Sequence, residues 1–271
     1  MAESPVMTAA LALLKAHPEL RRIIVGYSGG LDSHVLLHLL ATQRERWTTP
    51  GRTLAALYVD HGLQSVAAAW GEHCAGVCRE LGVPFRVLPI NARPESGDSP
   101  EAAARRARYA AFAAELGPEA ALLTAHHRDD QAETLLLQLL RGAGPHGLAA
   151  MPAISRLGQG RLLRPLLEMD RADLLAYACT HDLHWIEDAS NQDTGFDRNY
   201  LRQRILPLLR ERWPAAHRTL ARSAQWCAEA ASGLDEQAAA DLAHLATARP
   251  DVLPIPALRE LSESRQRLLL R

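Results

Sequence analysis

Three carboxylates and two histidines crowd residues 126–133 of the segment TAHHRDDQAET. Asp130 and Glu133 stand three positions apart, which places them on one face of a helix. The helix dipole explains one carboxylate in a first helical turn, but this cluster, which begins with His126, exceeds what capping needs. It could bind a metal ion, act as a general base or hold an ammonium group. The last two uses combine if the reaction requires an amine nucleophile, because a carboxylate can attract an ammonium group and take its proton.

The stretch SGGLDS, residues 28–33, directly follows an apolar run and could hold a phosphate. Gly29 and Gly30 allow positive φ and a close approach of a ligand to the backbone, and the flanking Ser28 and Ser33 add hydroxyl donors. A helix that begins here presents unpaired N–H groups to an anion. Asp32 fits an anion site chiefly if it holds a magnesium ion that also touches the phosphates. The alternative is an ordinary tight turn in which Asp32 complements the helix N-terminus.

Two further segments carry polar side chains, and each has two interpretations. VDHGLQ, residues 59–64, supplies Asp60 and His61, which could hydrogen-bond a nucleotide or cap the next helix. EAAARRARYAAF, residues 101–112, carries Arg105 and Arg108 one helical turn apart. These arginines would contact a phosphate or form a solvated basic face.

The charge of the chain is balanced overall but unevenly distributed. The formal net charge of −1 excludes a uniformly basic nucleic-acid binder. Between Arg198 and Arg222, however, seven arginines stand against one acid, Glu211. Such a segregated basic patch suits a phosphate backbone.

Cysteine content and hydropathy limit the class of protein. The four cysteines include no C-x-x-C pair, which argues against a zinc or iron–sulfur site, and a disulfide scaffold does not fit a chain of 271 residues. No stretch approaches eighteen uninterrupted apolar residues, and the N-terminus lacks the pattern of a signal peptide. We therefore expect a cytoplasmic protein without a membrane partner.

Short apolar runs alternate with helical patterns between about residues 22 and 140. The runs RRIIVGY, TLAALYVD, PFRVLPI and AALLTAH read as strands, and the stretches between them repeat apolar residues every three or four positions. This predicts an α/β fold: a Rossmann-like parallel sheet of about five strands with helices on both faces. Trp185 and Ile186 could form one further short strand, and Asp170 could cap a helix that runs to about residue 181. We expect residues 1–214 to form the catalytic domain and residues 215–271 a smaller, incomplete, all-helical one.

The string SGGLDS resembles the pyrophosphate-binding loop of the N-type ATP pyrophosphatases, a family that includes GMP synthetase, NAD synthetase and several tRNA-modifying enzymes. This resemblance implies that ATP is split between its α and β phosphates. It also implies that AMP passes to a substrate oxygen. The ATP-binding residues would then be Ser28, Gly29, Gly30, Leu31, Asp32 and Ser33, with Asp60 and His61 beside them.

Within that family, the chain is similar to the tRNA(Ile)-lysidine synthetases over roughly residues 20 to 230. The motifs VDHGLQ, ARRARY, AHHRDDQAET, RGAGPHGLAAM, RPLL and D-x-SN…RN-x-x-R occur in the same order. The resemblance implies that ATP adenylates O2 of the wobble cytidine of tRNA(Ile) with a CAU anticodon. The side-chain amine of free L-lysine then displaces AMP at C2. The residues carried over by this resemblance are Asp32 beside Mg²⁺, His126, Asp130 and Glu133 around the reacting groups and lysine, and Arg105, Arg108 and Arg198 near the adenylated intermediate.

Two departures and two alternatives accompany this hypothesis. Gln64 stands where many relatives have arginine, and the chain ends where many relatives continue into further tRNA-gripping domains, so we expect a truncated form. The first alternative is a cytidine thiolase, whose C-x-x-C cysteines are replaced here by Cys74 and Cys78 at C-x-x-x-C spacing. The second is a non-catalytic ATP-binding module, which would not need the carboxylate cluster. The sequence leaves the oligomeric state open, with a homodimer as one expectation.

Overall fold

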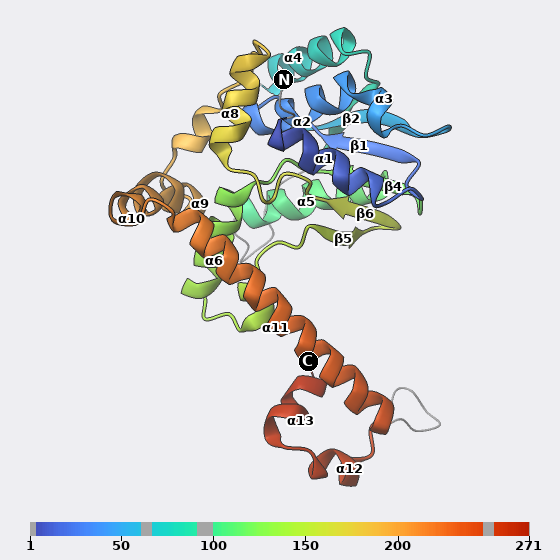
Figure 1. The fold of residues 1–271 in the computed structure, drawn as a ribbon, viewed down its shortest axis with the longest axis vertical. Coiled ribbons are helices and arrows are strands. Elements are labelled where there is room, and N and C mark those ends of the chain that lie inside the picture. Colours follow the sequence, from blue (N-terminus) through green and yellow to red (C-terminus); the bar gives the residue numbers. More distant parts are fainter. Residues whose placement is uncertain (1–3, 61–66, 91–99, 246–251, 271) are drawn as a thin grey trace.

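Six strands form one sheet in the order β3-β2-β1-β4-β6-β5, with helices on both faces (Figure 1). The structure is a computed structural model, and it describes residues 4–60, 67–90, 100–245 and 252–270. All neighbouring strands run parallel except β5 and β6, which are antiparallel. The strands are β1 (Arg22–Gly26), β2 (Thr53–Asp60), β3 (Phe85–Pro89), β4 (Ala120–Leu123), β5 (Ile154–Leu157) and β6 (Gly160–Leu163).

The predicted fold class is confirmed, and the four predicted strands correspond to β1 to β4. The proposed strand at Trp185 and Ile186 is wrong: the Ile186 N–H donates instead to the Gly29 carbonyl at 2.9 Å. The remaining strands come from a hairpin, β5–β6, whose turn contains Gly158 at φ +55°. Charged residues interrupt both runs of this hairpin, so its apolar pattern is weak.

The helices before the C-terminal segment connect and cover the strands. They are α1 (Pro5–Lys15), α2 (Leu31–Thr42), α3 (Arg44–Trp47), α4 (Ala67–Glu80), α5 (Pro100–Ala114), α6 (Arg128–Leu140), α7 (Pro145–Leu148) and α8 (Arg171–Thr180). A 3-10 turn, η1 (Ala189–Gln192), follows them. Asp170 precedes α8 as its N-cap residue, as predicted.

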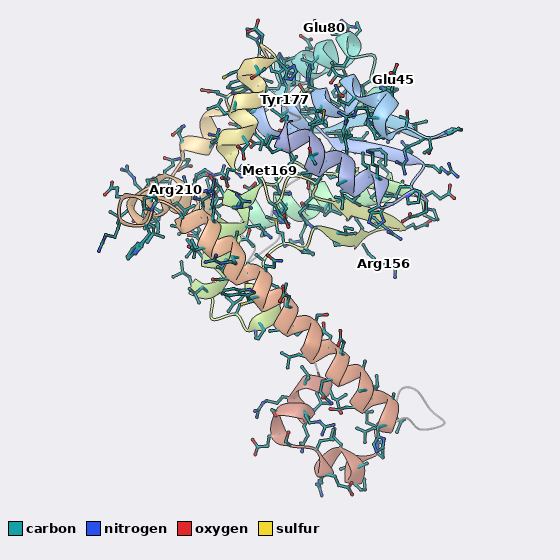
Figure 2. All side chains as sticks on the ribbon, viewed as in Figure 1. Glu45, Glu80, Arg156, Met169, Tyr177 and Arg210 are labelled. Carbon is teal, nitrogen blue, oxygen red and sulfur yellow. The ribbon has the colours of Figure 1, made fainter. Side chains whose placement is uncertain are left out.

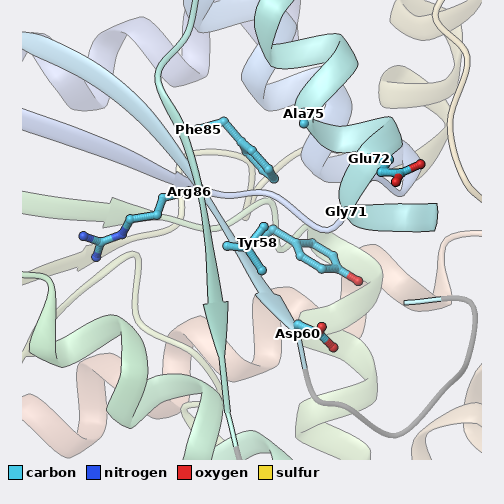
Figure 3. A pocket seen from close by; sticks show the side chains of 8 residues that line it. Tyr58, Asp60, Gly71, Glu72, Ala75, Phe85 and Arg86 are labelled. Atoms are coloured by element: carbon cyan, nitrogen blue, oxygen red, sulfur yellow. The ribbon is translucent and has the colours of Figure 1, made fainter. Parts of the chain in front are cut away.

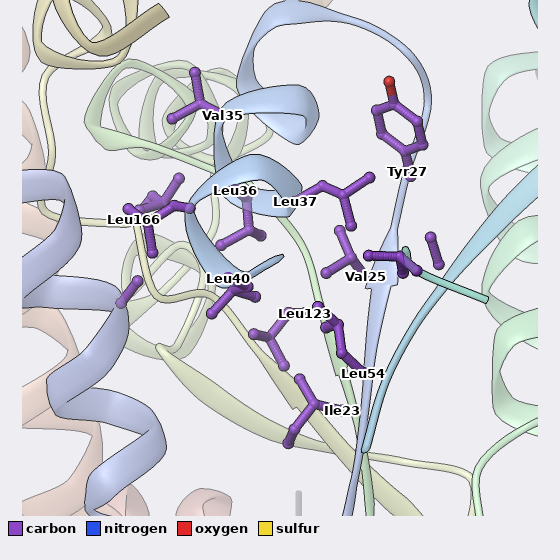
Figure 4. Close-up of a cluster of buried hydrophobic side chains, with 14 of the residues drawn as sticks. Ile23, Val25, Tyr27, Val35, Leu36, Leu37, Leu40, Leu54, Leu123 and Leu166 are labelled. Atoms are coloured by element: carbon purple, nitrogen blue, oxygen red, sulfur yellow. The ribbon is translucent and has the colours of Figure 1, made fainter. Parts of the chain in front are cut away.

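The alternation of side chains along β1 divides the core between the two faces of the sheet. Ile23 and Val25 pack with α1, α2, α4 and α8 in the larger apolar cluster, part of which Figure 4 shows. Ile24 points to the other face and packs with Phe112 and Leu116 from α5 and the turn after it. Because β1 is buried on both faces, it reads as a continuous apolar run rather than an alternating one.

The C-terminal part of the chain is helical. One continuous rod comprises α9 (Asp197–Tyr200), the π-helix η2 (Leu201–Ile205) and α10 (Leu206–Arg212). The long helix α11 (Ala216–Leu245) packs against α6 and α7 and then extends away from the sheet towards α12 (Ile255–Glu260) and α13 (Glu263–Leu269) (Figure 1). The domain boundary near residue 215 stays a prediction. Among the described helices, none combines the length and apolar character that a bilayer crossing needs.

Ion pairs attach α11 to the sheet-containing part of the chain. Asp170 accepts hydrogen bonds from Arg128 of α6 and from Arg218 of α11. Further along, His146 Nε2 lies 2.7 Å from Asp235 Oδ1 of α11. The start of α6, which carries the carboxylate cluster, is therefore tied to the C-terminal helix through Asp170.

Candidate active site

The SGGLDS loop joins β1 to α2 and is held by its own hydroxyl groups. The Ser28 N–H donates to Ser33 Oγ at 3.2 Å, and the Gly30 N–H faces Ser28 Oγ at 3.4 Å. Gly29 has φ +81°, a conformation that favours glycine. A Cβ at Gly29 would lie 2.8 Å from Ile186 Cδ1, so the loop has no room for a side chain there. Leu31 is the first residue of α2 and is buried. Because α2 begins just after the carboxyl end of β1, the unpaired N–H groups of its first turn lie at that edge of the sheet.

Asp32 and the α6 cluster meet through His127. This histidine lies directly before α6, and only 2% of its side chain is exposed. Its Nε2 lies 3.6 Å from Asp32 Oδ2 and 3.5 Å from Asp130 Oδ2. Burial lowers the pKa of His127, but the Asp130 and Asp32 carboxylates outweigh burial and raise the pKa above its ordinary value. The imidazole therefore bridges the phosphate-type loop and the carboxylate cluster.

One oxygen of Asp32 remains for a ligand. Asp32 Oδ1 is buried and has no hydrogen-bond partner in the described part of the chain. A buried carboxylate oxygen normally has a partner. Mg²⁺ is often held by one or two carboxylates together with substrate phosphates, so this oxygen fits the magnesium role expected for Asp32.

Glu133 is fully buried and paired with two arginines. Its Oε2 accepts from Arg198 Nε at 2.8 Å and from Arg202 Nη2 at 2.9 Å, and its Oε1 accepts from Arg202 Nε at 2.6 Å. Asp130 Oδ1 joins the same network, 2.9 Å from Arg202 Nη2 and 3.4 Å from Arg198 Nη2. Two carboxylates and two guanidinium groups thus neutralise one another inside the site.

This network sets the protonation of its members. Burial would raise the pKa of Asp130, but His127, Arg198 and Arg202 lower it well below its usual range. Desolvation lowers the pKa of Arg202, but hydrogen bonds and charge from Glu133, followed by Asp130 and Asp32, raise it. Asp130 is consequently an anion at neutral pH and a weak proton acceptor in this arrangement.

His126 lies beside the network as a neutral imidazole. Its Nδ1 is 2.8 Å from Thr124 Oγ1. Burial lowers the pKa of His126 to about 3, and the charges of Arg164, Arg198 and Arg105 add to this effect against the attraction of Asp130. An uncharged ring can offer one donor and one acceptor to a substrate at pH 7.

Arg105 and Arg108 are two of the three arginines of α5. Arg105 lies over the Tyr109 ring, with Cζ 5.1 Å from the ring centroid, and its charge reaches both His126 and Arg164. Arg108 follows one turn later, and burial together with the charge of Arg105 lowers its pKa. Arg164 is 7% exposed and donates to the Pro152 carbonyl at 2.6 Å. Its Nε is buried without a partner in the described chain, so it also lies ready for an acceptor.

Asp60 belongs to a different strand from the one that precedes the loop 28–33. It ends β2 and lines an open cavity of about 460 Å³ together with Tyr58, Glu72 and Phe85, at the edge of the sheet beside β3 (Figure 3). His61, the neighbouring candidate, lies outside the described residues. The contacts above therefore join the loop 28–33 to residues of α6, α9 and η2.

Two members of the site, His127 and Arg202, were missed as candidates in the sequence. His127 is the second residue of the histidine pair before α6, and Arg202 is the last arginine of the RN-x-x-R motif.

The ion pairs also change the interpretation of the basic segment, residues 198–222. Four of its seven arginines pair with carboxylates, namely Arg198, Arg202, Arg210 and Arg218. Arg210, which Figure 2 labels, lies 2.9 Å from Asp129 Oδ1.

The cysteines do not form a cluster site. Cys74 and Cys78 of α4 are completely buried in the larger apolar cluster, and burial raises the pKa of each thiol to about 12. Within the described residues, no group of three or more histidine, cysteine or acidic side chains could hold a metal ion. These thiols therefore behave as inert core side chains, which argues against sulfur transfer.

Comparison with known proteins identifies close relatives. Residues 3–209 match the family model described as the PP-loop domain. The chain is 52% identical over 250 residues to the tRNA(Ile)-lysidine synthase of Pseudomonas fluorescens (strain Pf0-1), and 53% identical over 256 residues to that of Pseudomonas aeruginosa. These alignments cover 90% and 91% of this chain but 55% and 57% of the relatives. The chain thus spans about half the length of the curated relatives it matches.

A solved structure shares the fold. The U34-tRNA thiolase NcsA from Methanococcus maripaludis, solved with its 4Fe-4S cluster, superposes with a TM-score of 0.67 at 16% identity, covering 83% of this chain and 78% of that one. At this identity the likeness concerns the fold alone.

Proposed function

The chain belongs to the PP-loop domain family, and from this membership we propose that it carries the chemistry of a tRNA(Ile)-lysidine synthase. ATP would adenylate O2 of the wobble cytidine of tRNA(Ile) with a CAU anticodon, and the side-chain amine of L-lysine would then displace AMP. One observation carries this proposal: His127 contacts both Asp32 of the loop and Asp130 of α6. The loop proposed to hold phosphate and the carboxylates proposed to hold the amine therefore lie next to each other.

In the first step the loop 28–33 would hold the β and γ phosphates of ATP. Cytidine O2 attacks the α-phosphorus, the bond from that phosphorus to the bridging oxygen breaks, and pyrophosphate leaves. Mg²⁺ bound with ATP would neutralise the charge that develops on the leaving phosphates. Asp32 would hold the ion through its free oxygen, and Arg105 and Arg164, whose charges reach His126, would neutralise the adenylate phosphate.

In the second step the lysine amine attacks C2 of the adenylated cytidine. The C2–O bond breaks, AMP takes the electron pair, and the attacking nitrogen loses a proton. Asp130 and Glu133 would hold the ammonium group and lie within reach of the released proton. Neutral His126 would hydrogen-bond the base or its leaving oxygen.

RNA would approach over the outward side of the rod formed by α9, η2 and α10. Every fourth residue there is exposed, forming the stripe Phe196, Tyr200, Arg204, Leu208 and Arg212. Exposed aromatic rings provide stacking surfaces for unpaired bases such as those of an anticodon loop. The exposed acids Asp197 and Glu211 flank the stripe, so stacking rather than net charge would provide the contact. We place this reaction in the cytoplasm, and light scattering would test the expected homodimer.

The test is incorporation of radiolabelled lysine into transcribed tRNA(Ile) bearing a CAU anticodon. A short anticodon stem-loop at high concentration serves as a second substrate, because the chain spans about half the length of the relatives. We expect label, AMP and pyrophosphate in equal amounts, and none from a transcript with a GAU anticodon. Asp130→Asn should abolish labelling while the exposed control Asp235→Asn retains it. Full labelling by Asp130→Asn, or none with either RNA, would contradict the proposal.

A further inference from the structure

Every oxygen of the carboxylate pair already has a partner. Both oxygens of Glu133 accept from guanidinium groups, and Asp130 Oδ1 faces the same two arginines. Asp130 Oδ2 accepts from the His127 N–H at 2.9 Å. The side chain of Glu133 is 0% exposed, so no face of it remains for a ligand.

This occupation conflicts with the binding of an amine. A lysine ammonium group carries three N–H donors and needs oxygen acceptors at close range. A fourth cation cannot join two carboxylates that two guanidinium groups and His127 already satisfy. Either the amine binds elsewhere, or at least one guanidinium must leave when it arrives.

Arg202 is the guanidinium that can leave. Its side chain is 40% exposed, against 21% for Arg198, so it can turn without crossing the core. It lies in the π-helix η2, a form that is rare in proteins and often found at functional sites. Its charge also interacts with Asp32, which places it within electrostatic reach of the loop 28–33.

We propose that Arg202 is a positioning residue that holds Glu133 and Asp130 until phosphate charge occupies the site, then turns to the phosphate and releases the carboxylates to the amine. This inference rests on the function proposed above. The ion pairs with Glu133 and Asp130 thus act as an internal substitute for the lysine ammonium. Lysine would bind productively only after nucleotide, which keeps the amine out until there is an electrophile for it.

One guanidinium cannot serve both partners, so phosphate and amine binding become coupled. Each ligand raises the affinity for the other by the same factor, because binding couplings are reciprocal. Typical couplings of this kind are roughly 5- to 150-fold. Direct attraction between a phosphate and an ammonium group also gives positive coupling. A variant of Arg202 is therefore needed to separate the coupling that this residue causes from that direct attraction.

The experiment measures L-lysine affinity by calorimetry, with and without saturating α,β-methylene-ATP and Mg²⁺. In the reference chain we expect nucleotide to tighten lysine binding by roughly 5- to 150-fold. Arg202→Gln should bind lysine more tightly than the reference chain when nucleotide is absent, and its coupling should fall towards one. A residue with a merely structural role would not raise affinity when removed.

Two further variants keep the test decisive. Arg202→Lys retains a cation if the glutamine variant does not fold, but lacks the two-pronged contact, so it should show intermediate coupling. Arg156→Gln is the control: this exposed arginine of β5 lies outside both proposed sites and makes no ion pair within the residues the structure describes. It should keep the coupling of the reference chain.

The outcomes separate the two proposals. Lysine binding that is equally tight with and without nucleotide in the reference chain, or full coupling in Arg202→Gln, would overturn the role of Arg202 while leaving lysine incorporation intact. Absence of lysine binding in both states, together with normal nucleotide binding, would overturn the proposed function and this inference with it.

Discussion

One added methyl group at Gly29 or Gly30 tests how the SGGLDS loop is built. Gly29 has φ +81°, and a Cβ there would lie 2.8 Å from Ile186 Cδ1 and 3.0 Å from Cys74 Sγ. Gly30 has φ −77°, and its Cβ would find its nearest heavy atom, Ser28 Oγ, at 3.6 Å. The two neighbouring glycines therefore form a matched pair, in which only Gly29 is required by the fold.

The expected loss of stability follows from two effects at Gly29. An alanine in the left-handed region costs about 1–2 kcal/mol, and overpacking against two buried side chains adds about 1–3 kcal/mol. Gly29→Ala should therefore lower the free energy of unfolding by about 2–5 kcal/mol. Gly30→Ala changes only an N-cap residue of α2 and should cost less than about 1 kcal/mol.

Urea unfolding measures both free energies, and calorimetry measures the affinity for ATP. At Gly30 a ligand, rather than the fold, would meet the new methyl group, so ATP binding should weaken while stability stays close to that of the reference chain. Equal destabilisation by the two substitutions would refute the reasoning. So would a Gly29→Ala variant as stable as the reference chain.

Three further predictions address other parts of the molecule. Burial lowers the pKa of His34 to about 4, and neighbouring histidines add to the effect, so the unfolded chain binds the proton first and stability falls as the pH drops below 6.5. By pH 5 urea unfolding should show that the free energy of unfolding has fallen by about 2 kcal/mol. The His34→Gln variant should lose less stability over the same pH range. Asp170 holds α11 to α6 through Arg128 and Arg218, so Asp170→Asn should speed amide hydrogen exchange in the first turns of α11 but not in the sheet. Unchanged exchange in α11 would contradict this role. Tyr200→Ala should weaken binding of the anticodon stem-loop by roughly 1–3 kcal/mol while ATP affinity stays unchanged, and equal RNA affinity would exclude stacking on this ring.

The elements that the sequence predicted share a strong local signal. β1, β2 and β4 contain buried apolar runs, β3 keeps apolar residues around Arg86, and the loop after β1 contains Gly29, where φ and crowding require glycine. The β5–β6 hairpin was missed because charged residues interrupt its apolar pattern. Its position is instead fixed by pairing of β6 with β4, a contact between segments about forty residues apart that no local pattern reveals.

The candidate site shows the same division between local and long-range signals. His126, Asp130 and Glu133 are neighbours in the sequence, so their types and spacing identified them. His127 differs from His126 only in the direction of its side chain, which depends on the turn before α6. Arg202 acquires its role only when α9 and η2 dock on α6, about seventy residues earlier in the chain.

The arginines after residue 197 illustrate why a count of charge does not describe a surface. In a helix, residues two positions apart point to nearly opposite sides, because each residue turns the chain by about 100°. Arg198, Arg202 and Arg210 therefore face the carboxylates of α6, while Arg204 and Arg212 face solvent. A segment that reads as one basic patch thus separates into an inner set that pairs with carboxylates and an outer stripe exposed to solvent. Because both sets belong to one rod, the proposed RNA contact on the outer stripe and the proposed release of Arg202 from Glu133 would act on the same short segment.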